Sequence, residues 1–161
     1  MTDDVATVAS DLAFRARALA QAHPLSPAAH RIVTRTVAHE SRTQPLEEVG
    51  VWAGAALTLG YCLRCVQEVA SDLDADIAGG LDDEALDRAA VVHADELRTG
   101  TGDELTVAAL DLLVGSQVGH RLDQWRDDLD PSAWADLEQY VTWWVVKGYG
   151  LRVAETSVPV T

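Results

Sequence analysis

Acidic side chains at alternating positions outline one candidate metal site in this chain. Three aspartates occupy positions one, three and five of a potential calcium loop and a fourth occupies position twelve: Asp72, Asp74, Asp76 and Asp83. Calcium takes six to eight oxygen ligands, which an acidic loop between two helices supplies. Ile77 stands where the sharp turn needs glycine, and Asp83 stands where a bidentate glutamate is usual. We therefore favour the alternative interpretation, a solvated acidic helix end and linker.

Two histidine–carboxylate pairs form a second candidate metal site. Each pair is spaced three residues apart on a predicted helix, so its two members share one helix face: His93 with Glu96, and His120 with Asp123. Di-metal helical bundles place a Glu-x-x-His motif on facing helices, whereas here the histidine comes first. A helical histidine is more often a partly buried core residue or a surface residue. We expect no cofactor, with a divalent metal ion as the alternative.

The other chemistry-bearing residues match no catalytic motif. The chain has no glycine-rich phosphate loop, no GxSxG and no HExxH. Cys62 and Cys65 have CxxC spacing, but a redox CxxC needs its first cysteine at a helix N-terminus, where the thiol pKa is lowered. Both cysteines lie deep inside a predicted helix. We expect them to be small buried hydrophobic residues.

A basic stripe and an aromatic group are the candidate interface residues. Arg31, Arg35 and Arg42 recur on one side of a predicted helix. The stripe is either a solvated face or a docking surface for the acidic region 68–104, in this chain or in a second copy. The aromatic residues near the C-terminus are dense: Trp134, Tyr140, Trp143, Trp144 and Tyr149. Because tryptophan and arginine are enriched at binding hot spots, we expect Trp143 and Trp144 at an interface, with core packing as the alternative.

Helices must position these residues. An uncharged apolar run predicts the central helix. Residues 49–63 carry no charge and are bounded by Glu48 and Arg64. Fifteen residues are too few to cross a hydrocarbon layer, which takes about 20, so the run predicts a buried helix of a soluble protein. Its glycines and alanines let other helices approach closely. We expect Trp52, Leu57 and Leu59 to be buried.

Hydrophobic spacing and helix-capping residues predict six helices and no strand. Ser26 with Pro27, and Asp82, are typical of helix starts. The last helix ends near Gly148 or continues to Glu155. The predicted helices span about 3–22, 27–42, 45–74, 82–98, 102–129 and 131–148 or 131–155. This pattern predicts an all-α, single-domain bundle of about six helices, with central buried helices near 45–74 and 102–129.

Charge is unevenly distributed along the 161 residues, whose net charge is −14. Within the single domain we distinguish a mildly basic helical pair over 1–45, an acidic helical core over 46–156 and a frayed tail over 157–161. The strong negative field disfavours nucleic acid and anionic membranes as partners. The acidic start at 1–4 is unlike a signal peptide. We therefore expect a cytoplasmic protein.

The charge asymmetry, the arginine stripe and the spare aromatic residues favour a non-enzymatic interaction or regulatory protein that acts as a homodimer, with a further protein partner. The alternative is a divalent-metal-binding helical bundle or a metal-dependent hydrolase that uses histidines and carboxylates of the helices between 45 and 129. The second hypothesis requires His93, His120 and at least two carboxylates to converge in one pocket.

Overall fold

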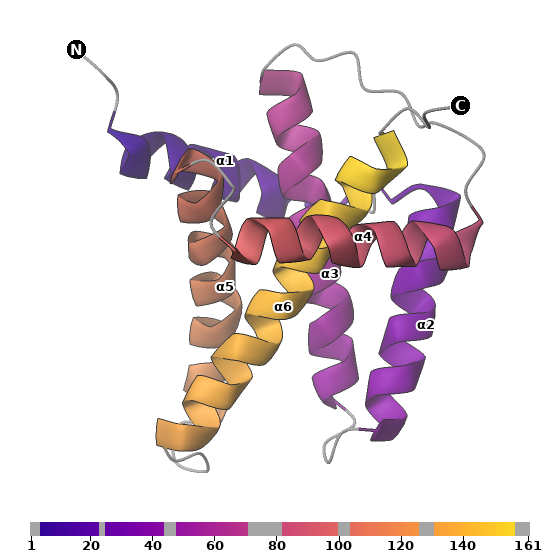
Figure 1. Cartoon of the computed structure of the whole chain (residues 1–161). Coiled ribbons are helices and arrows are strands. Elements are labelled where there is room, and N and C mark those ends of the chain that lie inside the picture. The colour runs from indigo at the N-terminus through magenta and orange to yellow at the C-terminus, as the bar shows by residue number, and fades with distance from the viewer. Residues whose placement is uncertain are drawn as a thin grey trace.

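Six α-helices and no strand make up the part of the chain that the structure describes (Figure 1). This computed structural model describes residues 4–22, 25–43, 48–70, 82–99, 104–125 and 131–156, apart from the side chains at 48, 120–125, 131, 133 and 134. The helices pack into one bundle, which confirms the predicted all-α class. They are α1 (Val5–Ala20), α2 (Pro27–Thr43), α3 (Glu48–Ala70), α4 (Asp83–Arg98), α5 (Glu104–Trp125) and α6 (Pro131–Thr156).

Capping side chains fix where three of the helices begin. The Asp4 carboxylate accepts a hydrogen bond from the Ala6 amide at the start of α1. Ser26 accepts one from the Ala29 amide at 3.0 Å, and Asp82 accepts one from the Ala85 amide at 2.7 Å. Each bond satisfies an amide that has no partner within its own helix. The predicted caps at Ser26 and Asp82 are therefore confirmed.

Helix α3 lies in the middle of the bundle, as predicted. It packs against α1, α2, α5 and α6, and Figure 1 shows the other helices arranged around it. Trp52, Leu57 and Leu59 are buried. Burying large apolar side chains stabilises a fold by about 1.5–3 kcal/mol each, so this uncharged helix supplies much of the core.

Helices α3 and α6 pack so closely that neither Gly60 nor Gly148 leaves room for a methyl group. A methyl group on Gly60 would overlap the Val145 carbonyl oxygen, and one on Gly148 would overlap the Leu57 carbonyl oxygen. The two glycines therefore face each other's helix backbone, and this contact explains why helix-weakening residues occur in two long helices. Helix α6 continues through Gly148 to Thr156, which confirms the longer of its two predicted extents.

The second central helix is α6. The sequence had led us to expect a central position for the segment near 102–129, which forms α5. Helix α6 packs against α3, α4 and α5. Helix α5 buries Ala109, Leu110 and Leu113, but the opposite face is exposed, including Leu112 and Gly115. The apolar residues of this segment were insufficient to predict its position, because apolar residues also occur on exposed helix faces.

Helix α3 is longer than its charge-free run. The 22 residues Val49–Ala70 are long and apolar enough to cross a membrane by length and composition alone, so the length of the fifteen-residue run does not distinguish a buried helix from a membrane span. Two thirds of the most apolar 18-residue stretch of this helix is buried inside the bundle. That position is typical of a core helix of a soluble protein.

Candidate functional site

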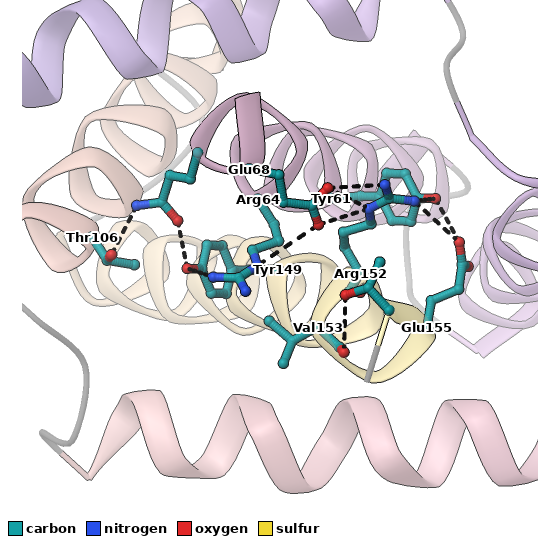
Figure 2. A network of polar contacts seen from close by, with 10 residues as sticks. Tyr61, Arg64, Glu68, Thr106, Tyr149, Arg152, Val153 and Glu155 are labelled. Carbon is teal, nitrogen blue, oxygen red and sulfur yellow. Dashed lines mark hydrogen bonds and ion pairs between the residues drawn. The ribbon is translucent and has the colours of Figure 1, made fainter. Parts of the chain in front are cut away.

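A buried network of charged side chains joins α3 to α6 (Figure 2). The guanidinium of Arg152 on α6 donates to both carboxylate oxygens of Glu68 on α3, with distances of 3.0 Å from Nε to Oε1 and 2.9 Å from Nη2 to Oε2. The Glu68 and Arg152 side chains are 6% and 14% exposed. Burial is the largest single influence and lowers the pKa of Arg152, but the hydrogen bond to Glu68 and the interactions with Cys65 and Tyr61 together raise it more, so the net pKa lies above its usual value. The Arg152 guanidinium therefore stays protonated.

The network reaches the start of α2 through a second buried carboxylate. The hydroxyl groups of Tyr61 and Ser26 donate to Glu155 at 2.7 Å and 2.8 Å. Arg152 donates to the Tyr61 oxygen at 3.1 Å. Burial and the hydrogen bond to Glu155 raise the pKa of Tyr61 to about 12. Ser26 thus performs two tasks, since it caps α2 and also ties that helix start to α6.

On the other side the network reaches α5. Arg64 donates to the Tyr149 hydroxyl at 3.2 Å, and that hydroxyl donates to the Gln67 side-chain oxygen. The Gln67 amide in turn donates to Thr106 at 2.9 Å. The network thus links α2, α3, α5 and α6, and its charged groups are engaged with one another. We interpret it as a device that fixes the register of α3 against α6.

The two cysteines lie beside this network and are poorly suited to thiolate chemistry. Cys62 is buried and Cys65 is partly buried, and both are free thiols. Burial raises the pKa of Cys62 to about 12, and burial is also the main cause that raises the pKa of Cys65 to about 11. Since the nucleophile is the thiolate, neither residue is primed to react near neutral pH.

We expect both thiols to react with Ellman's reagent at pH 8 at least tenfold more slowly in the folded protein than in urea, because thiolate formation is suppressed and access is restricted. The measurement is the absorbance increase with time, with free cysteine as the reference. Reaction of the folded protein at the rate of free cysteine would show that this environment has been misassigned.

A groove between α2 and α6 is the candidate ligand site. Both helices pack on α3, and α4 packs on α6 and contacts α2; Figure 1 shows α4 crossing the bundle at this side. The space has a volume of about 390 Å³, which falls within the usual range for small-molecule sites. Its lining residues are Ile32, Arg35, Thr36, His39, Glu40, Arg42, Asp87, Trp144 and Lys147. We call this space the α2–α6 groove.

The polar residues deep in the groove are engaged with neighbours. The Lys147 ammonium lies 2.8 Å from Asp87 and 5.1 Å from the Trp144 ring centre. The Tyr140 hydroxyl donates to Glu40 at 2.6 Å. Burial is the main cause that raises the pKa of Tyr140 above its usual value, and the hydrogen bond to Glu40 raises it further. The lysine and the glutamate are each largely buried and each has a partner of complementary chemistry.

The arginines predicted for an interface lie in or beside this groove. Arg31 donates to both carboxylate oxygens of Asp83 on α4, at 2.7 Å and 2.9 Å, and this bond lowers the pKa of Asp83. Arg35 lies 3.7 Å from the same carboxylate. Asp83 belongs to the acidic region 68–104, so two arginines of the stripe meet that region within the chain. Arg42 lines the groove and has no ion pair among the described residues.

The two predicted interface tryptophans contact each other edge-to-face with ring centres 6.5 Å apart, but only Trp144 lines the groove. Trp144 lines the groove and packs edge-to-face against Tyr140 with ring centres 6.1 Å apart. Trp143 lies outside the lining, is partly buried and has the Arg98 guanidinium 5.4 Å from its ring centre. The homodimer that these residues suggested stays a prediction.

The predicted metal ligands are described only in part. His93 and Glu96 lie 3.6 Å apart on α4. The side chains of His120 and Asp123 on α5 fall outside the described residues, so convergence of the two pairs stays untested. Among the side chains that the structure does describe, no group of three or more histidine, cysteine or acidic residues is arranged to hold a metal ion. Of the four aspartates proposed as calcium ligands only Asp83 is described, and Arg31 donates to both its oxygens.

Sequence reasoning missed the buried charges. Glu40, Glu68, Lys147 and Glu155 are all buried although charged residues are seldom buried unless paired. A signal was available, because Glu68 and Glu155 stand among apolar residues of their helices and Lys147 directly follows the core residues Val145 and Val146. Comparisons with protein-family models, with curated proteins and with solved structures find no match.

Proposed function

We propose that this chain is a non-enzymatic, cytoplasmic binding protein that takes a small organic ligand in the α2–α6 groove. The observation that carries the proposal is the groove itself, since its volume of about 390 Å³ is lined by the buried Ile32 and the Trp144 ring together with exposed basic side chains. Ligand sites are typically concave, apolar in their walls and supplied with a few polar groups that orient the ligand.

The state of the acidic side chains supports binding over proton transfer. Glu40 accepts the Tyr140 hydroxyl proton in a hydrogen bond, and Asp87 pairs with Lys147. A general base must reach a substrate proton directly or through one water, and both carboxylates are already occupied by protein groups. The proposal thus keeps the non-enzymatic role expected from the sequence and gives it a site.

Filling the groove should abolish ligand binding. Thr36→Tyr places a ring in the groove, so we expect the affinity for the neutral fluorescent probe N-phenyl-1-naphthylamine to fall at least tenfold, because the probe loses its apolar contact area. The readout is probe fluorescence on titration with protein. Thr142→Tyr is the matched control on α6, at a partly exposed position that does not line the groove.

Binding that is unchanged in the Thr36→Tyr protein would contradict the proposal, since the probe would then occupy another site. Equal losses in the Thr36→Tyr and Thr142→Tyr proteins would contradict it too. Circular dichroism of each variant establishes that the bundle is intact before the affinities are compared.

A further inference from the structure

We infer that the ligand of the α2–α6 groove is a small organic anion, a carboxylate or phosphate monoester with an apolar body, whose charged group is held by Arg35 and Arg42. This inference rests on the proposed function and specifies the class of ligand. The observations that support it are the distribution of charge around the groove, the exposure of the arginines and the chemistry of the groove walls.

Basic side chains form one rim of the groove. Arg35, His39 and Arg42 follow one another at four- and three-residue steps on α2, so they project from the same helix face. The two arginines are separated by about 10 Å along the helix axis, at 1.5 Å per residue. The Arg35 and His39 side chains are 62% and 68% exposed, and Arg42 is also exposed. Their charged groups are therefore accessible to a ligand.

The local charge is opposite in sign to that of the whole chain. The lining contains three permanently positive side chains against two acids, so it carries a net positive charge even with His39 neutral, while the chain carries −14. Asp87 is compensated by Lys147 at 2.8 Å, and Glu40 is 11% exposed and bound by Tyr140. What a ligand meets at the rim is thus predominantly basic.

Arg35 and Arg42 have few partners among the residues that the structure describes. Arg35 has a single contact of 3.7 Å to Asp83, a carboxylate that already receives two short hydrogen bonds from Arg31. No described residue pairs with Arg42. A guanidinium presents several donors in a planar fork that matches carboxylate and phosphate oxygens. Both residues therefore have donors to spare for an anionic ligand.

The groove walls indicate the rest of the ligand. Ile32 is buried beneath the rim, and the Trp144 ring and the Thr36 side chain complete the apolar part of the lining. An inorganic ion would leave these groups in contact with water, whereas an apolar body covers them and gains the free energy of that burial. The combination favours an amphipathic molecule about the size of a one- or two-ring compound.

Three probes of matched size test the inference: 1-naphthyl phosphate, 1-naphthoate and neutral 1-naphthol. In calorimetric titrations at low ionic strength, at least one of the two anions should bind tenfold more tightly than 1-naphthol, since charge-assisted hydrogen bonds to arginine add to the same apolar contact. Whichever anion binds more tightly identifies the preferred charged group. Raising the salt concentration should narrow the difference.

The double variant Arg35→Gln with Arg42→Gln should weaken binding of the preferred anion at least tenfold and leave 1-naphthol binding unchanged. Arg88→Gln removes a similar charge from α4, where Arg88 pairs with the exposed Glu84, and should leave all three affinities unchanged. Equal binding of 1-naphthol and both anions overturns the inference, as does an anion preference that survives the double variant.

The two proposals fail in different ways. If the probes bind with no anion preference and the Thr36→Tyr substitution abolishes that binding, the groove is a ligand site and only the charge inference is wrong. If no probe binds the wild-type protein, or if Thr36→Tyr leaves every affinity unchanged, the proposed function is wrong as well.

Discussion

Replacing Gly60 with alanine should lower the free energy of unfolding by about 2–3 kcal/mol, because the added methyl group meets backbone and not a movable side chain. The nearest atoms to that methyl are the Val145 carbonyl group and the Tyr149 amide nitrogen of α6. Helix α6 can avoid the overlap only by moving away from α3, which opens the central interface. Gly148→Ala should have a similar effect, since its methyl group meets the Leu57 backbone.

Gly115→Ala is the matched control, because it adds the same methyl group to a helix interior. A methyl on Gly115 meets no atom within 4 Å. Alanine is a better helix former than glycine by about 1 kcal/mol, so this variant should be more stable than the wild type. Urea unfolding followed by circular dichroism measures all three changes. A Gly60→Ala protein as stable as the wild type would show that α3 and α6 do not cross this closely.

Arg152→Met should lower the free energy of unfolding by about 3–5 kcal/mol, the usual cost of breaking a buried ion pair from one side. The methionine fills similar space but leaves the Glu68 carboxylate without its two strong donors, and Tyr61 and Glu155 without a neighbouring positive charge. Both carboxylates are nearly inaccessible to water, so solvent cannot replace the lost partner.

Two further variants separate the ion pair from other effects of the substitution. Combining Arg152→Met with Glu68→Gln should cost less than the sum of the two single changes, since the double variant no longer buries the unpaired Glu68 charge. Arg88→Met removes an arginine whose partner Glu84 is exposed and should change stability by less than about 1 kcal/mol. Additive losses at residues 68 and 152 would show that the two side chains do not interact as described.

The helical class and most of the helix boundaries follow from local patterns in the sequence. The capping residues Ser26 and Asp82 act through bonds to amides three residues away, and such local chemistry is visible in the chain. The burial of Trp52 and Leu57 was predictable for a related reason, since a long uncharged helix in a soluble protein must be covered by other helices. The glycines of α3 likewise indicated close packing.

Tertiary packing determines which helix contacts α3 at those glycines. It also determines which residues pair with the buried charged side chains. Arg152 and Glu68 are 84 residues apart, and Tyr140 and Glu40 are 100 residues apart. Helical spacing defines the faces of one helix but not which faces of two helices meet, so neither pair was evident from the chain. For the same reason the arginine stripe was recognisable, whereas the groove beside it required α2, α4 and α6 to be placed in space. The packing of α6 on α3 therefore brings together the residues of both the buried network and the candidate ligand site.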